Sequence, residues 1–288
     1  MQCYKRVLII PFLFLTLTAC LQDIGEQHPE RSGSLITGAE QFSLYIPLLE
    51  GKRVAIAANQ SSVIRDKHLV DTLLSKGVEV IQIVKVFAPE HGFRGEAAAG
   101  ELIQDGVDPK TGIPIISLYG RNKKPDMSQL EDVDIILFDI QDVGVRFYTY
   151  ISTMSYLMEA AAEQDITMVI LDRPNPNGFY IDGPVLEKEH QSFVGLHPVP
   201  VVYGMTIGEY ALMVNGEYWL KDSLQCDLEV IPLKNYDRDK IYELPVKPSP
   251  NLPGWEAVFL YPSLCLFEGT VMSVGRGTDF PFTVYGHP

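Results

Sequence analysis

The first half of the chain contains five short apolar runs that are typical of buried strands. They span residues 53–59, 78–87, 113–119, 134–140 and 167–171. Residues 66–76 carry apolar side chains along one helical face, and residues 150–164 are rich in Ala, Met and Glu. Continuous apolar strands that alternate with helices are typical of a parallel sheet buried on both faces. The sequence therefore predicts an α/β fold in which helices cover both faces of a mostly parallel sheet.

A cluster of polar residues follows each apolar run. The clusters are Asn59-Gln60, Glu90-His91, Tyr119-Gly120-Arg121, Asp139 to Arg146 and Asp172 to Asn177. The carboxyl ends of parallel strands lie at one edge of a sheet, and ligands of α/β proteins bind outside that edge. We therefore expect the five clusters to form a single crevice. The alternative for residues 86–101 is a solvated surface loop.

The second half of the chain has a different pattern. Thr206, followed by Glu209 three residues later, forms a capping-box signature that predicts a helix to about Leu220. Residues 228–233 read as a strand, whereas the four prolines of residues 245–254 exclude regular structure there. This change of pattern indicates a domain boundary near residue 185.

Sequence motifs for cofactors and nucleophiles are absent. The loop after the first apolar run reads Asn59-Gln60-Ser61-Ser62-Val63, without the glycines that a nucleotide-binding loop needs. The sequence contains no GxxxxGK[ST], CxxC, HExxH or GxSxG motif. We therefore expect no cofactor, and nothing at the level of motifs indicates a metal. Carboxylates, tyrosines, His91 and arginines are left to carry the chemistry.

These residue types suit glycoside hydrolysis. In that reaction a carboxylic acid protonates the leaving oxygen, and a second group attacks or activates water. Glu90 is the predicted general acid, because it ends a strand and the nearby Phe87 and Phe93 are expected to raise its pKa by desolvation. Asp142 and Glu268 are the other predicted catalytic carboxylates. The alternative role for Glu90 is to cap backbone amides in its loop.

Planar polar groups and aromatic faces are typical of sites that hold sugars. The predicted binding residues are His91, Arg94, Asp139, Gln141, Arg146, Tyr148, Tyr150, Asp172, Arg173, Asn175, Asn251 and Arg276. For two pairs, Asp139 with Arg146 and Asp172 with Arg173, a structural ion pair is the alternative.

The first twenty residues indicate a targeting signal. Lys5 and Arg6 precede an apolar stretch over 7–18 that is too short to span a membrane. Leu17-Thr18-Ala19-Cys20 resembles the lipobox of bacterial lipoproteins, which implies a signal peptide over 1–19 and a lipid on Cys20. Residues 20–34 would then be a polar tether. The expected location is periplasmic or at the cell surface, with an ordinary secretory signal as the alternative.

Net charge limits the possible binding partners, and the cysteine count limits the possible disulfides. The net charge of −14 argues against nucleic acid or an anionic surface as a partner. The expected membrane contact is therefore the lipid anchor alone. Besides Cys3 and Cys20, the chain has Cys226 and Cys265, which would form either one disulfide or two thiols.

Eight ordered motifs resemble one known family. They are residues 88–95, 117–120, 139–150, 171–178, 192–195, 204–209, 248–253 and 267–278. Together they resemble the exo-β-N-acetylmuramidases of the NamZ type, glycoside hydrolase family 171, from about Gly38 to the last residue. The resemblance implies a Rossmann-like domain, a smaller α+β auxiliary domain and an active site between them. It also implies release of N-acetylmuramic acid from the non-reducing ends of peptidoglycan fragments, with Glu90 as the leading catalytic candidate.

The resemblance sets expectations for domains and for recognition. We expect a catalytic domain over 35–185 and an auxiliary domain over 186–288, incomplete because family members continue for several dozen residues. The lactyl carboxylate of N-acetylmuramic acid needs an arginine, for which Arg94, Arg146, Arg173 and Arg276 are the candidates.

Three further alternatives bear on mechanism and function. The acetamido group of the substrate is an alternative nucleophile, which Asp142 or Asp139 would orient. A muropeptide-binding lipoprotein without catalysis is the alternative function, since it needs the same crevice but not Glu90. A lipid-anchored esterase or amidase is disfavoured by the missing nucleophile motif.

Overall fold

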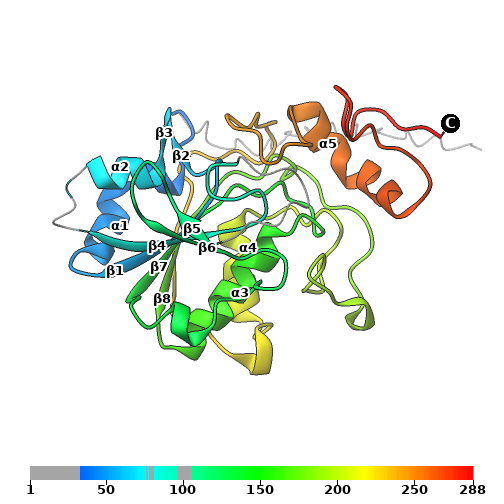
Figure 1. Ribbon diagram of the computed structural model, residues 1–288. Helices are drawn as coiled ribbons and strands as arrows, with labels where there is room; N and C mark the ends of the chain where they lie inside the picture. Colours follow the sequence, from blue (N-terminus) through cyan, green and yellow to red (C-terminus); the bar gives the residue numbers. More distant parts are fainter. Residues whose placement is uncertain (1–32, 76, 78–80, 96–104, 288) are drawn as a thin grey trace, which may run out of the picture. The chain divides into compact units, whose positions relative to one another are not determined.

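A seven-stranded sheet organises the chain in the computed structural model, which describes residues 33–75, 77, 81–95 and 105–287 (Figure 1). The strand order is β5-β6-β4-β1-β7-β8-β9, and every neighbouring pair is parallel except β5 with β6. The strands are β1 (Arg53–Ala58), β4 (Gln82–Ala88), β5 (Gly106–Val107), β6 (Pro114–Ser117), β7 (Ile135–Asp139), β8 (Thr167–Leu171) and β9 (Leu228–Ile231). The order of the parallel strands reverses at β1, as in doubly wound Rossmann folds. The predicted α/β fold is confirmed.

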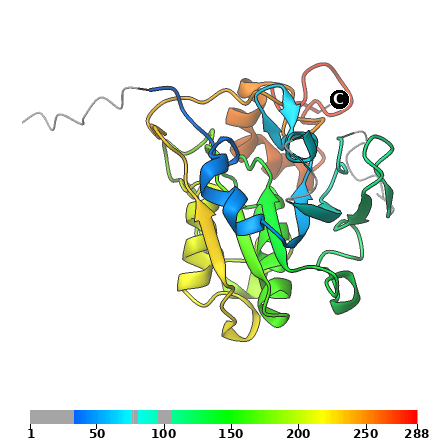
Figure 2. The ribbon, with the colours of Figure 1, turned by 90° about the vertical axis from the view of Figure 1, so that its left-hand side faces the viewer.

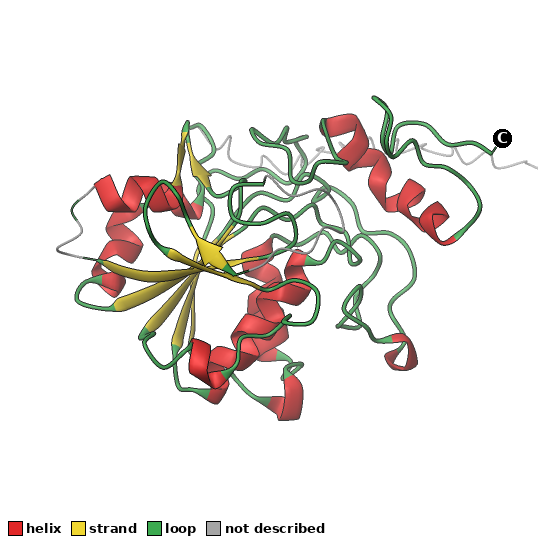
Figure 3. Ribbon diagram, viewed as in Figure 1, coloured by secondary structure: helices red, strands yellow, loops and turns green. Residues whose placement is uncertain are grey.

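Helices cover both faces of the sheet. Figures 1 and 3 show α1 (Phe42–Leu49) and α2 (Leu69–Ser75) on one side of the fan of strands, with α3 (Tyr150–Glu163) and α4 (Ile207–Gly216) on the other. Side chains alternate between the two faces of a strand, so each strand contributes to two cores. In β7, Leu137 packs into the α1–α2 core and Phe138 into the α3–α4 core.

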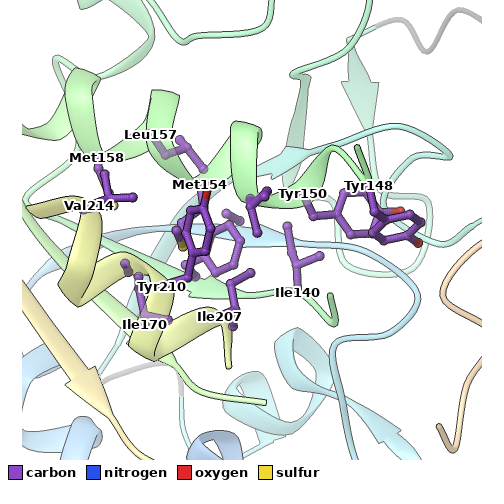
Figure 4. Packing of buried hydrophobic residues seen from close by; sticks show 14 of the residues in the cluster. Ile140, Tyr148, Tyr150, Met154, Leu157, Met158, Ile170, Ile207, Tyr210 and Val214 are labelled. Carbon is purple, nitrogen blue, oxygen red and sulfur yellow. The ribbon is translucent and has the colours of Figure 1, made fainter. Parts of the chain in front are cut away.

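The α3–α4 core is the larger of the two. Figure 4 shows Met154 and Met158 of α3 together with Ile207, Tyr210 and Val214 of α4 in this core. All five side chains are almost completely buried. Burial of a large apolar side chain contributes roughly 1.5–3 kcal/mol, so this cluster is a main source of the stability of the sheet.

The register of the sheet aligns the strand ends. Ala57, at the end of β1, pairs with Phe87 of β4 on one side and with Phe138 of β7 on the other. The loops after β4 and β7 therefore leave the sheet at the same level. Figure 2 shows the orange segment that contains α5 (Trp255–Leu264) at this end of the sheet.

Short elements complete the described chain. They are the hairpin of β2 (Val63–Ile64) and β3 (Lys67–His68), and the 3-10 turns η1 (Gly38–Glu40), η2 (Met127–Gln129), η3 (Lys188–His190), η4 (Lys221–Ser223) and η5 (Cys265–Gly269). Among the described residues, no helix is long and apolar enough to cross a membrane. Residues 1–32, which carry the predicted signal and Cys20, lie outside this description, as do residues 76 and 78–80 of the predicted helix and strand.

Most predicted elements are present with shorter bounds. The predicted strand over 167–171 matches β8, and the irregular segment over 245–254 is confirmed. The Thr206–Glu209 capping box is formed, but α4 ends at Gly216 rather than near Leu220. Sequence patterning did not indicate α1 and α5, each of which contains a proline (Pro47 and Pro262) that argues against a helix.

The sheet and core continue past the predicted boundary at residue 185. β9 pairs with β8 in the same sheet, and Tyr210 and Phe282 belong to the same core as Phe138. The division into domains over 35–185 and 186–288 stays a prediction, and residues 33–288 form one compact unit. Cys226 and Cys265 are free thiols, which decides between the two alternatives for this pair.

A buried ion pair connects the ends of β7 and β8. Arg173 Nε and Nη2 donate to the two carboxylate oxygens of Asp139 at 2.6 and 2.8 Å. Arg173 also donates to the carbonyl oxygen of Val63 at 3.0 Å. The side chains of Asp139 and Arg173 are almost completely buried. Asp139 therefore pairs with Arg173, and not with Arg146 as the sequence alternative had it.

We expect Asp139→Asn to lower the free energy of unfolding by about 3 kcal/mol or more, because it leaves a buried guanidinium without its counter-charge. Asp134→Asn is the matched control at the other end of β7. Its ion pair with Arg53 at 2.7 Å is 33% and 42% exposed, so we expect a loss of about 1 kcal/mol or less. Urea denaturation at pH 7 measures both, and equal losses would contradict the structural role of Asp139.

Candidate active site

The turn after β4 presents Glu90. Pro89 begins the turn, and the backbone N–H of Gly92 donates to the carbonyl oxygen of Pro89 at 3.0 Å. His91 and Gly92 both have left-handed backbone conformations, with φ of 72° and 78°. Two consecutive positive φ angles reverse the chain sharply. Glu90 is half-buried at the edge of the cleft that this turn forms.

The loop after β7 supplies a second wall of aromatic residues. Tyr148 and Tyr150 are buried, with ring centroids 4.8 Å apart in an edge-to-face arrangement. The Tyr148 hydroxyl donates to the carbonyl oxygen of Pro248 at 2.8 Å, and the Tyr150 hydroxyl lies 3.4 Å from that oxygen and from the carbonyl oxygen of Glu90. These bonds attach the irregular segment over 245–254 to the strand ends.

The C-terminal segment forms the third wall. Glu268 of η5 makes an ion pair with Arg276, and it accepts a hydrogen bond from Cys265 Sγ at 3.2 Å. The Glu268 side chain is 29% exposed and that of Arg276 is 46% exposed, so solvent reaches both. The ring of Tyr261 packs edge-to-face on Tyr148 and on Phe282, which connects this wall to the second.

The three walls enclose a cleft of about 150 Å³. Its lining consists of Glu90, His91, Phe147, Tyr148, Thr149, Tyr150, Ser249, Asn251, Leu252, Tyr261, Glu268, Arg276 and Phe282. Two carboxylates, one guanidinium and several aromatic faces thus meet in one concavity. This arrangement can transfer protons, bind an anion and stack against a sugar ring.

Tyr119 holds the carboxylate of Glu90. It follows β6, and its hydroxyl is hydrogen-bonded to the Glu90 side chain. Burial and the negative charge of Glu90 raise the pKa of Tyr119, so its hydroxyl keeps its proton. A hydroxyl both donates and accepts, and Tyr119 can therefore remain bonded to Glu90 whether or not the carboxyl group is protonated.

Seven of the residues predicted from sequence line the cleft. They are Glu90, His91, Tyr148, Tyr150, Asn251, Glu268 and Arg276. The five polar clusters follow β1, β4, β6, β7 and β8 at one edge of the sheet. Glu90 and His91 are the cluster residues that line this cleft, so the expectation that all five clusters form it together is wrong. The roles assigned to these residues stay predictions.

The other predicted arginines make structural contacts instead. Arg94 is bonded to Asp71 and Asp108, with its shortest ion-pair contact at 2.8 Å. Arg146 donates to the carbonyl oxygens of Pro184 and Val199 at 2.7 and 2.5 Å. Arg173 pairs with Asp139. Of the four candidates for the lactyl carboxylate, Arg276 alone lines the described cleft.

The remaining predicted residues also lie outside the cleft lining. Gln141 donates to the carbonyl oxygens of Asp142 and Pro174, both at 2.7 Å, and Asn175 donates to that of Met205 at 2.8 Å. Asp172 accepts from Thr206 Oγ1 and from the Gly208 backbone N–H at 2.9 and 2.8 Å, so it binds the start of α4. These contacts take the place of the Asp172–Arg173 ion pair that the sequence left open as an alternative.

Asp142 is buried behind the second wall. Its Oδ2 accepts from the Tyr203 hydroxyl and, at 2.6 Å, from the Gly144 backbone N–H. Burial raises the pKa of Asp142 to about 6, while the bonds from Tyr203 and Gly144 act in the opposite direction. Asp142 thus has the raised pKa expected of a general acid, but not the access to the cleft that Glu90 and Glu268 have.

Sequence reasoning did not select Tyr119, Ser249 or Tyr261. Tyr119 lies in one of the polar clusters that follow the strands, so its position was available as a signal. Ser249 and Tyr261 come from segments about 100 residues beyond the second wall, and nothing in their local sequence indicates that they join it. Among the described residues, Glu187, Glu189 and His190 are the one group able to hold a metal. All three are exposed, at the start of η3 and within it, and none of them lines the cleft.

Two family models match successive parts of the chain. The model for the N-terminal part of the exo-β-N-acetylmuramidase NamZ matches residues 54–256, and the model for its C-terminal part matches residues 259–288. The chain belongs to the NamZ family. The cleft lies where the two matched parts of this NamZ-family chain meet, because Glu90 comes from the first and Glu268 from the second.

Known relatives agree with this assignment. The peptidoglycan β-N-acetylmuramidase NamZ of Bacillus subtilis (strain 168) is 47% identical over 255 residues, which cover 85% of this chain and 59% of the relative. The crystal structure of one DUF1343 family protein from Bacteroides fragilis NCTC 9343 is 52% identical, with a TM-score of 0.80 over 88% of this chain and 67% of that one. The crystal structure of another DUF1343 family protein from the same organism is 36% identical, with a TM-score of 0.79 over 87% of this chain and 65% of that one. The family resemblance inferred from the motifs is confirmed.

Asp142 is expected to make stability depend on pH. Its folded pKa of about 6 lies above the ordinary value of 3.8, so its contribution is present below about pH 4 and is lost as the pH rises through 6. Between pH 4.5 and pH 7 the unmodified chain should lose about 2 kcal/mol more stability than Asp142→Asn, which cannot ionise. Urea denaturation at the two pH values measures this difference.

The control is Asp66→Asn, which changes an exposed carboxylate. We expect it to follow the unmodified chain at both pH values. If Asp142→Asn also followed the unmodified chain, Asp142 would titrate normally and the raised pKa would be refuted.

Proposed function

We propose that this chain is an exo-acting glycoside hydrolase that releases N-acetylmuramic acid from the non-reducing ends of peptidoglycan fragments. The observation that carries the proposal is the placement of Glu90 and Glu268 on different walls of one cleft. Family membership and the name of the Bacillus subtilis relative support the choice of substrate. Because the chain spans 59% of that relative, the activity is tested on the chain itself.

Glu90 is the general acid in this mechanism. It donates its proton to the glycosidic oxygen as the bond between that oxygen and the anomeric carbon breaks. Tyr119, bonded to the same carboxyl group, holds it in place before and after the transfer. Tyr150 helps to position Glu90 through its backbone, since the Tyr150 hydroxyl lies 3.4 Å from the Glu90 carbonyl oxygen.

Glu268 is the second carboxylate. Water adds to the anomeric carbon and gives a proton to Glu268, so the products are free N-acetylmuramic acid and a fragment shortened by one sugar. The ion pair with Arg276 and the bond from Cys265 hold the Glu268 side chain at the cleft. Asp139 and Asp142, the predicted partners of an acetamido nucleophile, do not line the cleft.

Arg276 is proposed to recognise the lactyl carboxylate. It lines the cleft with a half-exposed side chain and one carboxylate partner, so its remaining N–H groups can reach a second anion. N-acetylglucosamine has no lactyl group and would not make this contact. Selectivity for muramic acid therefore depends on Arg276.

We also propose that the protein acts from a lipid anchor in cell-wall turnover. The lipobox-like Leu17-Thr18-Ala19-Cys20 supports a lipid on Cys20, and the following polar residues to Ser34 would be the tether. A lipoprotein outside the cytoplasmic membrane would meet peptidoglycan fragments where they are produced. Metabolic labelling with a fatty acid, with Cys20→Ala as the control, tests this location.

Glu90→Gln should abolish hydrolysis but not binding. We expect a loss of roughly 10²- to 10⁴-fold in the turnover of a chromogenic β-N-acetylmuramide, because the amide cannot donate the proton. Steady-state kinetics measure the turnover, and calorimetry with N-acetylmuramic acid measures the binding. Binding without turnover in the unmodified chain would refute the hydrolase and favour a muropeptide-binding lipoprotein.

Arg276→Ala should remove the preference for muramic acid. We expect kcat/KM for the β-N-acetylmuramide to fall roughly 10- to 100-fold more than that for the β-N-acetylglucosaminide, because the lactyl carboxylate is present in the muramide alone. Arg238→Ala is the matched control, since Arg238 forms a similarly exposed ion pair with Glu209 away from the cleft. An unchanged ratio of the two kcat/KM values in Arg276→Ala would exclude Arg276 as the selectivity residue.

A further inference from the structure

A second concavity lies beside the cleft, and we call it the aromatic groove. It has a volume of about 330 Å³, and its lining comes mainly from the irregular segment over 241–248 and the first half of α5. Its lining consists of Pro176, Phe179, residues 241–248, residues 252–255, Val258 and Phe259. The lining is mostly apolar, with Glu243 and Lys247 as its charged members.

Three aromatic rings form one side of the groove. Phe179 and Phe259 are stacked with centroids 6.0 Å apart and planes 19° apart, and Trp255 lies 6.3 Å from Phe259. Trp255 and Phe259 are each 43% exposed although they are large apolar residues. Exposed aromatic faces that border a concavity mark a binding surface.

The groove is a neighbour of the cleft. Leu252 lines both concavities, and Pro248 lines the groove while its carbonyl oxygen is held by Tyr148 of the cleft. Helix α5 also borders both, with Trp255 at its start facing the groove and Tyr261 near its end facing the cleft. The two concavities therefore border each other at Leu252.

We propose that the aromatic groove binds sugar rings on the leaving-group side of the glycan, while the cleft holds the terminal N-acetylmuramic acid. This inference rests on the proposed function. A glycan is the occupant that fits, because its next sugar is covalently attached at the bond that Glu90 protonates. Pyranose rings present flat C–H faces that pack against aromatic rings, which suits a lining with few charged groups. A stem peptide, rich in carboxylates and amines, fits this lining less well.

The wall between the two sites is held in place. Gln60 Nε2 donates to the carbonyl oxygens of Lys247 and Pro248 at 3.2 and 3.0 Å, and the prolines of the segment restrict its backbone. A fixed wall keeps the spacing between groove and cleft constant. Binding of the leaving group in the groove therefore helps to position the scissile bond at Glu90.

The test compares substrates of different length on the full chain. The chromogenic β-N-acetylmuramide reaches the cleft alone, and peptide-free glycans of increasing length reach the groove. We expect kcat/KM to rise with length, and the Trp255→Ala/Phe259→Ala double variant to lose about tenfold on the long glycans through KM. Its turnover of the chromogenic substrate should stay unchanged, which also shows that the variant is folded.

The matched control is Phe280→Ala, which removes a 59% exposed aromatic side chain that lines neither concavity. It should not change any of these values. The proposal is overturned if chain length has no effect, if the double variant slows both substrates equally, or if the gain appears with stem peptides in place of further sugars.

Measurements of glycan binding distinguish a failure of the groove proposal from a failure of the proposed hydrolase. If the unmodified chain does not turn over the chromogenic substrate, the hydrolase fails. Calorimetry with a peptide-free glycan then tests the groove alone: weaker binding by the double variant than by Phe280→Ala upholds it, and equal binding refutes it.

Discussion

The carbonyl oxygen of Pro248 joins the C-terminal half of the cleft to the sheet. It is bonded to the Tyr148 hydroxyl and to Gln60, which come from the loops after β7 and β1. The segment around Pro248 has no regular structure and few backbone donors, so side chains have to fix it. The positions of Asn251, of α5 and therefore of Glu268 depend on this attachment.

Burial decides which charged residues remain available for a ligand. A guanidinium taken out of water needs a counter-charge, and Arg173 and Arg94 have theirs in Asp139, Asp71 and Asp108. Arg276 lies closer to solvent with Glu268 as its partner. A substrate carboxylate that approaches Arg276 therefore competes with Glu268 for the same guanidinium, so recognition of the anion and the position of the second carboxylate are linked.

The sequence predicted local patterns well and long-range contacts poorly. Buried strands such as β8 and the edge at which Glu90 lies follow from apolar runs and the geometry of parallel sheets. Residue type alone could not distinguish Arg276 from Arg146 as the ligand of a substrate carboxylate. After folding, Arg146 donates to two backbone carbonyl oxygens, whereas Arg276 lines the cleft. The bond between Tyr148 and Pro248 spans 100 residues, and α5 contains a proline, so neither had a local signal.

The proline-rich wall between cleft and groove explains how an irregular segment can define a site. Prolines reduce the freedom of the unfolded chain, so less conformational entropy is lost when the segment is ordered. The hydrogen bonds to the carbonyl oxygens of Lys247 and Pro248 then select one arrangement. A helix or strand would use those carbonyl groups within its own backbone. An irregular wall leaves them free to bond with loops from the sheet, which places Ser249 and Leu252 against the tyrosines that follow β7.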